Sequence, residues 1–553
     1  MENELNIGMA FSGGGYRAAT FDLGTLSFLN SIRLEDGRTL LSCVTALTSV
    51  SGGTIPALKY MLALAKGQPI DEMVNELFHF LCNEDLVTHA LNGIGTEKAN
   101  RDASSIKIMA GIYDKYLFKG ATMGDIIDSM DREDDKDPIP VKDYTALATD
   151  FDNSLPFRFR VTYGYMTSGN RISYGVFGNN DHYIGLDTAR HITPGEALAC
   201  SSCFPSGFEP MMYPDDFQVS QQPDIASTIT TRFGIMDGGV VDNQGIGPLM
   251  LAEERLHDYR KDKQRKDKAF DLVIISDVAG PDMDGYAPSE QMLPKSTGRL
   301  TLGRLCNYGL ISEAVVMVLF ILALVLGSNF WLGVMTVILA IVTLLNIVGA
   351  LFKNKIFKAI SSTFIGDRAR FLNHMKFASV EAMVMNRAKS IIMMSSEVFL
   401  NQLRRKNYDS VYENNDWLNR RITSTIYELK PSEPKRNGKK QKKRKWEYQD
   451  FPSELKPSEA IQRNSKLAAS MNTTLWFTPE DKAAGKPQAL LATGQYNTCY
   501  NLLDYINTIE KDPTNTTPAH RLIIACKPQL QEAWQKFQTN PQWMVPKVNP
   551  ADR

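Results

Sequence analysis

Residues 5–17 read LNIGMAFSGGGYR, an apolar segment that ends directly in three glycines. The apolar run Leu5–Ser12 predicts a short buried strand, and the glycines predict a tight turn whose uncovered N–H groups can face a ligand. Similar segments rich in β-branched and aromatic residues predict further strands at Cys43–Thr48, Tyr144–Phe151, Phe157–Gly164, Arg232–Asp237 and Asp271–Asp277. Segments with helical spacing, such as Ile70–Leu81 and Pro194–Cys200, lie between them. The alternation predicts an α/β sheet covered by helices.

A second junction between a strand and a turn carries a candidate nucleophile. Residues 49–53 read SVSGG, which is the pattern G-x-S-x-G with serine in place of the first glycine. In a nucleophile elbow the central serine sits on a tight turn between a strand and a helix. Cys43–Thr48 supplies the strand and Thr54–Ala65 supplies the helix, so Ser51 is the candidate. An ordinary Ser-Gly turn is the alternative interpretation of this motif taken alone.

A third junction carries a candidate base. A serine hydroxyl is a weak nucleophile until a base takes its proton, and histidine is the usual base. None of the seven histidines has motif-like surroundings, whereas Asp237-Gly238-Gly239 directly follows a predicted strand. Asp237 is therefore the preferred base, with Asp242 and Asp277 as rivals. The glycine turn at residues 13–15 fits an oxyanion hole, in which N–H groups bind the negative oxygen of a tetrahedral intermediate.

Together, the three junctions resemble the patatin-like phospholipases over roughly residues 5–280. That family has a G-G-G-x-[RK] loop, a G-x-S-x-G elbow and a D-G-[AG] motif in this order, as at residues 13–17, 49–53 and 237–239 here. Residues 148–152 (ATDFD) and 197–210 (ALACSSCFPSGFEP) are also similar to family segments. The order of the motifs is more specific than any one of them.

The resemblance implies a three-layer α/β/α hydrolase with a serine–aspartate dyad and no histidine. Ser51 would attack a lipid ester, and Asp237 would accept its proton and later activate water. The N–H groups of Gly13, Gly14 and Gly15 would bind the oxyanion, while Arg17 would brace this loop or neutralise a lipid phosphate. No cofactor and no metal are expected. Ser49 departs from the family pattern, and its extra atoms would crowd the elbow.

The 39 residues between Glu313 and Lys353 contain no charged side chain. A bilayer core is about 30 Å thick, so one helical crossing takes about 20 residues. The run therefore predicts two transmembrane helices at 308–352, with a turn at Gly327-Ser328-Asn329 and a first helix that Glu313 leaves barely long enough. A pair of buried core helices or a shallow re-entrant hairpin is the alternative. Basic residues outside both ends predict that both ends face the cytoplasm: Arg299, Arg304, Lys353, Lys355 and Lys358.

The predicted organisation is a catalytic domain at 1–300, the hairpin at 308–352, and a helical and mixed region at 353–553 that completes the catalytic domain. Leu475–Phe477 and Leu490–Leu491 are interpreted as strand pieces that rejoin the sheet. Residues 435–445 (KRNGKKQKKRK) predict an exposed basic loop that also suits anionic lipid head groups. Small residues such as Gly327 and Gly333 allow transmembrane hairpins to associate, which leaves a homo-oligomer open.

Composition restricts the class of function. The 553 residues carry 61 basic and 62 acidic side chains, so no basic excess favours nucleic acid. Seven scattered cysteines predict free thiols in a reducing compartment, and Cys200-x-x-Cys203 lacks the second pair that a zinc site needs. The start MENEL lacks the features of a cleavable secretion signal.

The function expected from the sequence is a membrane-anchored lipid acyl hydrolase of the phospholipase A type, with its catalytic domain facing the cytoplasm. The alternatives are a catalytically silent membrane scaffold or lipid-binding protein, and a serine hydrolase of soluble esters. The sequence does not specify the lipid head group or the acyl position.

Overall fold

The computed structural model describes residues 5–86, 88–89, 104–130, 139–162, 177–205, 207–227, 229–262, 269–280, 286–288, 299–361, 374, 376–394, 398–431, 451–511 and 517–547. The predicted basic loop at 435–445 lies outside these residues. The chain divides into two compact units. Unit 1 comprises Met1–Asp282 and Val398–Arg553, and unit 2 comprises Met283–Glu397.

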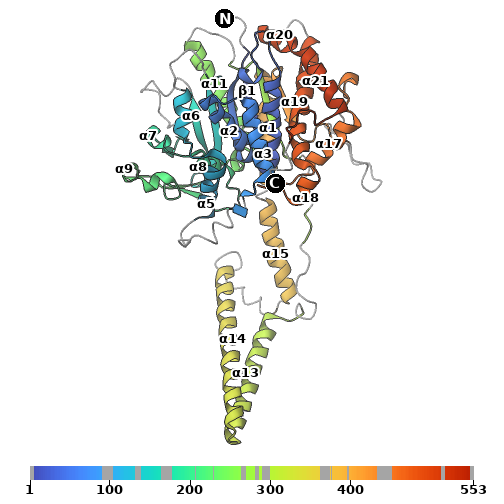
Figure 1. Ribbon diagram of the computed structural model, residues 1–553. Helices are drawn as coiled ribbons and strands as arrows, with labels where there is room; N and C mark the ends of the chain where they lie inside the picture. Colours follow the sequence, from blue (N-terminus) through green and yellow to red (C-terminus); the bar gives the residue numbers. More distant parts are fainter. Residues whose placement is uncertain are drawn as a thin grey trace. The chain divides into compact units, whose positions relative to one another are not determined.

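Unit 1 is built on a ten-stranded mixed sheet (Figure 1). Its parallel part has the spatial order β10 (Arg421–Thr425), β9 (Leu272–Asp277), β1 (Ile7–Phe11), β2 (Val44–Val50), β3 (Asp143–Asp150). The sheet continues from β3 through the antiparallel strands β4 (Leu155–Thr162), β5 (Phe177–Gly178) and β6 (Tyr183–Ile184). The six predicted strands are all present, close to their predicted bounds.

Two further strands, β8 (Phe233–Asp237) and β7 (Met211–Tyr213), join the sheet beyond the point where β2 ends. Strand β8 pairs antiparallel with residues 148–150 of β3, and β7 pairs with β8. Strand β2 pairs only with residues 143–147 of β3. The ends of β2 and β8 therefore lie side by side along one edge of β3.

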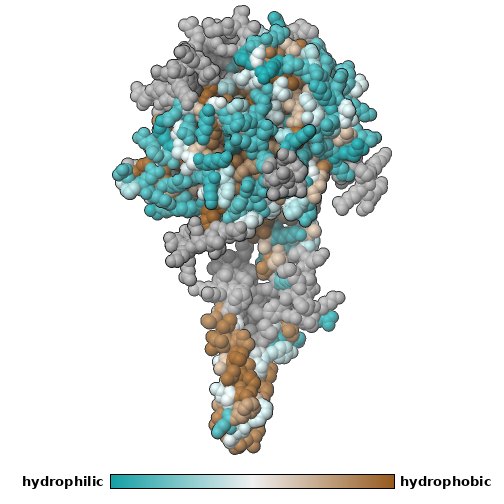
Figure 2. Space-filling view, in the orientation of Figure 1, coloured by the Kyte–Doolittle hydropathy of each residue, from teal (hydrophilic) through white to brown (hydrophobic). Residues whose placement is uncertain are grey.

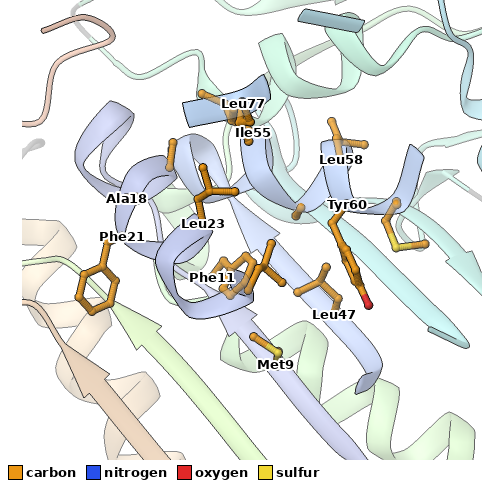
Figure 3. Close-up of a cluster of buried hydrophobic side chains, with 14 of the residues drawn as sticks. Met9, Phe11, Ala18, Phe21, Leu23, Leu47, Ile55, Leu58, Tyr60 and Leu77 are labelled. Atoms are coloured by element: carbon orange, nitrogen blue, oxygen red, sulfur yellow. The ribbon is translucent and has the colours of Figure 1, made fainter. Parts of the chain in front are cut away.

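Helices cover both faces of the sheet, because successive strand residues point to opposite sides. On one face, α1 (Gly15–Ser31), α2 (Thr54–Lys66) and α3 (Ile70–Asn83) pack with Met9, Phe11 and Leu47 of the strands (Figure 3). On the other face, α11 (Ile246–Asp262) and α16 (Phe399–Tyr412) pack with Ala10, Val273 and Ile275. The larger cluster also includes residues of α5 (Ser105–Ile112), α6 (Met123–Met130), α8 (Pro194–Ser202), α17 (Glu459–Ala469), α19 (Lys486–Glu510), α20 (Pro518–Ala525) and α21 (Lys527–Thr539).

The chain after unit 2 contributes to the sheet and to one helical layer of unit 1. Strand β10 pairs with β9, and α19 packs directly on α1. The predicted strand pieces are wrong, because Leu475–Phe477 is a loop and Leu490–Leu491 lies inside α19. Pro487 in the first turn of α19 starts a helix that continues through both leucines. Glycines allow α19 and α1 to approach closely, since a Cβ at Gly494 of α19 would overlap the backbone of α1.

Unit 2 contains α13 (Leu302–Val325), α14 (Asn329–Ser361) and α15 (Phe377–Met393). Helices α13 and α14 pack together as a hairpin whose surface is mostly hydrophobic (Figure 2). By length and composition, Asn307–Val325 and Asn329–Leu351 are candidate membrane spans. Only 6% and 0% of their most apolar windows are buried, which disfavours the alternative of soluble core helices.

Glu313 lies inside the first candidate span instead of ending it. Its carboxylate accepts hydrogen bonds from Thr343 Oγ1 (2.9 Å) and Asn346 Nδ2 (2.9 Å) of α14. Asn346 Nδ2 also donates to the Gly309 carbonyl (3.0 Å). A charged residue in an apolar hairpin is tolerated when partners satisfy it, so the candidate span extends beyond the uncharged run.

Candidate active site

Ser51 occupies a sharp turn between β2 and α2. Its φ of 51° lies in the left-handed region, which non-glycine residues rarely adopt. The turn requires glycines after it, because a Cβ at Gly52 would overlap the Gly15 backbone and one at Gly53 would approach Ser12 O to 2.7 Å. Ser49, the departure from the family pattern, is buried and lies 3.4 Å from the Tyr144 hydroxyl. The elbow therefore accommodates a serine at that position.

The structure brings Ser51 and Asp237 together at the ends of β2 and β8. Ser51 Oγ donates a hydrogen bond to Asp237 Oδ2 (2.9 Å), and the Gly239 N–H donates to Oδ1 (2.7 Å). The Asp237 side chain is buried, and burial raises its pKa to about 6 against the hydrogen bonds from Gly239 and Ser51, which lower it. A carboxyl group with this pKa is ionised at neutral pH and is well matched to proton transfer there.

The rival aspartates have other partners. Asp242 accepts hydrogen bonds from the backbone N–H groups of residues 244, 245 and 247 and from Asn407. Asp277 forms an ion pair with Arg404 and accepts a hydrogen bond from the Tyr408 hydroxyl. These contacts give both carboxylates a structural role in unit 1.

Helix α8 and the residue that follows it bind the backbone of both Ser51 and Asp237. The Ser51 N–H donates to Ser201 Oγ (2.9 Å), and the Ser201 hydroxyl donates onward to the Leu147 carbonyl (2.7 Å). The Asp237 N–H donates to the carbonyl of Cys203, one residue past the end of α8 (3.2 Å). Motif analysis did not single out Ser201, although it lies in the 197–210 segment that is similar to the family.

The glycine loop offers fewer donors than predicted. The Gly13 N–H donates to the Asn243 carbonyl (2.9 Å) and is therefore occupied. Gly14 and Gly15 stand at the amino end of α1, and neither N–H donates a hydrogen bond within the residues that the structure describes. Open N–H groups at a helix amino terminus attract negative charge. Two of the three predicted donors thus remain open beside the elbow.

Asn243 is a second residue that sequence reasoning missed. It directly follows α10 (Gly239–Asp242), and its side-chain oxygen would collide with a Cβ at Gly13. A Cβ at Gly239 would lie 2.7 Å from the same oxygen and 3.0 Å from Asp237 Oδ1. Asn243 therefore joins the glycine loop to the Asp237 turn.

Arg17 connects the start of α1 to the C-terminal part of unit 1. The side chain is buried, and Nη1 donates to the Met471 carbonyl (3.0 Å) and the Tyr427 hydroxyl (3.3 Å). The neighbouring Tyr16 N–H donates to the Thr474 carbonyl (2.7 Å). Of the two roles that the resemblance implied for Arg17, these contacts match bracing of the loop.

The described residues contain no group of three or more His, Cys, Asp and Glu side chains placed to bind a metal ion. Cys200 and Cys203 are buried and unpaired, and they contact Met211 Sδ and the Glu209 carbonyl respectively. Burial raises the pKa of the Cys203 thiol to about 12, so this thiol stays protonated.

No protein-family model and no curated protein matches this chain. Among solved structures, human GIVD cytosolic phospholipase A2 is similar, with a TM-score of 0.30 and 12% sequence identity. The match covers 50% of this chain and 43% of that one, so the chain spans less than half the length of this neighbour. A similarity of this size identifies neither family nor activity, and the case for function rests on the geometry of the site.

Proposed function

We propose that this chain is a patatin-like lipid acyl hydrolase of the phospholipase A type, anchored in a membrane by α13 and α14. The observation that carries the proposal is the 2.9 Å hydrogen bond from Ser51 Oγ to Asp237 Oδ2. It joins a hydroxyl on a strained elbow to a buried carboxylate, beside a helix amino terminus with open N–H groups. This set matches the needs of acyl transfer: a nucleophile, a base and an oxyanion site.

In the first half of the reaction, Ser51 Oγ attacks the ester carbonyl carbon while Asp237 takes the hydroxyl proton. The oxyanion receives hydrogen bonds from the N–H groups of Gly14 and Gly15, with the Gly52 N–H as a third donor. Collapse breaks the ester C–O bond, and Asp237 returns the proton to the leaving alcohol. In the second half, Asp237 deprotonates a water that attacks the acyl-enzyme, and the fatty acid leaves as Ser51 regains its proton.

The membrane part of the proposal rests on the hairpin. Two apolar helices joined by a short turn return the chain to the side from which it came. The basic residues at 299, 304, 353, 355 and 358 favour a cytoplasmic location for both ends. An enzyme that is held at a bilayer gains effective concentration of a bilayer substrate.

The test is fatty-acid release from mixed phospholipid vesicles by the reconstituted chain, its Ser51→Ala and Asp237→Asn variants, and Ser202→Ala. Ser202 is the matched control, because its hydroxyl contacts Leu198 O (2.7 Å) and the Tyr113 hydroxyl (3.5 Å) and neither Ser51 nor Asp237. Release by the parent and the control, lost in both dyad variants, supports the proposal. Release that survives Ser51→Ala contradicts the nucleophile. Hydrolysis restricted to short soluble esters would instead favour a soluble-ester hydrolase, and no hydrolysis of either substrate would favour the silent scaffold.

A further inference from the structure

The face of the sheet that α11 covers carries three arginine side chains on β4 and α11. Arg158 and Arg160 stand two positions apart on β4, so they share one face of the sheet, about 7 Å apart along the strand. Arg255 of α11 reaches the same face, because it binds the carboxylate of Asp143 in β3 (2.8 and 2.9 Å). Asp143 pairs with Thr162 of β4, two residues beyond Arg160. We call Arg158, Arg160 and Arg255 the arginine cluster.

The guanidinium of Arg158 has no acceptor. It makes no hydrogen bond or ion pair within the residues that the structure describes, although its Nε is buried. The carboxylates of this region are bound by other groups. Asp143 binds Arg255, and Asp242 accepts hydrogen bonds from three backbone N–H groups and from Asn407. Arg158 is therefore a partly buried cation without a bound counter-ion.

The surroundings of Arg158 also disfavour its charge. Burial, together with the positive charges of Arg255 and Arg160, lowers the pKa of the Arg158 guanidinium to about 10, although Asp242 raises it. The group still carries its proton at neutral pH. An anion bound beside it would compensate both the burial and the repulsion between like charges.

Two buried polar residues beside the arginine cluster have unpartnered side chains as well. Thr145 of β3 stands directly across from Arg160, is fully buried, and has a hydroxyl without a partner in the described part of the chain. Both amide atoms of the fully buried Gln244 are unpartnered in the same sense. Gln244 precedes Gly245, whose carbonyl accepts a hydrogen bond from Thr48, the residue of β2 opposite Thr145. Buried polar groups nearly always have partners, so these groups favour a polar species bound here.

We infer that the arginine cluster and the Thr145 hydroxyl form a binding site for a phosphate group, either a free phosphate ion or the phosphomonoester of a head group. Guanidinium groups match the spacing of phosphate oxygens, and a tetrahedral oxyanion accepts donors from more directions than a planar carboxylate does. Water alone would satisfy Thr145 and Gln244 but would leave the charge of Arg158 uncompensated. Arg158 and Arg160 are partly exposed, so a small anion can reach them from solvent. The inference does not depend on hydrolysis by Ser51.

The test is isothermal titration of the full chain in detergent micelles with inorganic phosphate and with glycerol 3-phosphate, at an ionic strength fixed by sodium chloride. The parent is predicted to bind at least one of them. Arg158→Gln is predicted to weaken binding at least about tenfold, because hydrogen bonds to a charged group are lost. Arg232→Gln is the matched control, since it removes the same charge from a side chain that is 72% exposed and paired with Asp215. It is predicted to bind like the parent.

The two probes distinguish the sources of the phosphate group. Tighter binding of glycerol 3-phosphate supports the inference and identifies a phosphomonoester head group, whereas tighter binding of inorganic phosphate supports it and identifies the free ion. Failure of the parent to bind either probe overturns the inference. Equal affinities of the parent and Arg158→Gln also overturn it, and so does acetate that binds as tightly as phosphate.

A second variant separates binding from folding. Thr145→Val keeps the shape of the side chain and removes only its unpartnered hydroxyl, so the free energy of unfolding without phosphate is predicted to stay equal or to rise. Its affinity for phosphate is predicted to fall about threefold. If Arg158→Gln does not fold, Thr145→Val decides alone, and an unchanged phosphate affinity in this variant then overturns the inference.

Discussion

Ser51 Oγ lies 2.9 Å from Asp237 Oδ2, although the residues are 186 positions apart and stand at the ends of β2 and β8, which do not pair with each other. Strand β3 brings them together, because β2 pairs with its first half and β8 with its last three residues. The dyad therefore depends on a mixed sheet in which a parallel and an antiparallel neighbour share one edge of β3. Helix α8 then fixes both backbones through Ser201 and Cys203.

Ser51→Gly is predicted to abolish hydrolysis and to raise the free energy of unfolding by about 1 kcal/mol, because glycine adopts a φ of 51° without strain. Ser154→Gly is the matched control, since Ser154 has a φ of 57° and lies outside the dyad. It is predicted to gain similar stability with full activity. Chemical denaturation of the reconstituted chain measures the free energy of unfolding of both variants. No gain for Ser51→Gly beside a clear gain for Ser154→Gly would show that the elbow stores no strain.

Hydrolysis is predicted to rise with pH through about 6, where Asp237 loses its proton. The base works only as a carboxylate, so kcat/KM falls below pH 6 and reaches a plateau above it. The same raised pKa has the opposite effect on stability. The folded state keeps a proton that the unfolded chain releases near 3.8, so this group lowers stability as pH rises from about 4 to about 6.

Burial also raises the pKa of Asp242 to about 6, so a pH profile alone does not identify the base. The decisive comparison is Asp237→Asn. This variant is predicted to be inactive at every pH and at least as stable as the parent at pH 7, since it removes a buried charge. If Asp237→Asn were inactive and also had a markedly lower free energy of unfolding than the parent, Asp237 would be mainly structural.

Ser201→Ala is predicted to lower kcat by about tenfold to a hundredfold with little change in KM. The substitution leaves the Ser51 N–H without its acceptor, which costs about 1–3 kcal/mol and frees the elbow to shift. Ser202→Ala on the same helix should retain activity, because the Ser202 hydroxyl contacts Leu198 O and the Tyr113 hydroxyl and neither Ser51 nor Asp237. Steady-state kinetics on a soluble ester, which avoid vesicle binding, test the difference. If the two variants changed kcat equally, Ser201 would have no specific role in the candidate site.

Asn346→Ala is predicted to weaken the hairpin by about 0.5–1.5 kcal/mol, because Glu313 loses a donor in an apolar setting. Thr336→Ala is the control, since its hydroxyl donates to Leu332 O within α14. Denaturant unfolding in detergent micelles compares them. If neither substitution changed the free energy of unfolding, the hydrogen bonds between α13 and α14 would contribute no net stability.

The sequence predicted the parts of the fold that repeat an apolar pattern. The strands that lead to Ser51 and Asp237, VTALTSV and FGIMD, are buried on both faces and contain no charged residue before Asp237 itself, so they could be predicted without a structure. Strand β10 was missed because its sequence, RITST, contains a single apolar residue, Ile422, as is common in a strand at the edge of a sheet. Leu490 and Leu491 were misread because a short apolar run fits a helix as well as a strand.

The candidate site was predictable at positions where close approach of the backbone permits only glycine. Glycine at 52 and 53 follows from the close approach of Gly15 and Ser12, which any side chain would block. The roles of Ser201 and Asn243 were not predictable, because their hydrogen bonds join segments that only the folded sheet brings together. For the same reason, the hydrogen bond that occupies the Gly13 N–H could not be predicted from the sequence.

The most direct test of the dyad is covalent labelling of the reconstituted chain with an alkyl fluorophosphonate, followed by mass spectrometry of its peptides. An activated serine attacks the phosphorus and displaces fluoride, so the label reports the nucleophile without any choice of lipid. The prediction is a single modified peptide that carries the phosphonate on Ser51, with labelling lost in Asp237→Asn. Labelling of another serine, or labelling of Ser51 that persists at full rate in Asp237→Asn, would contradict the dyad.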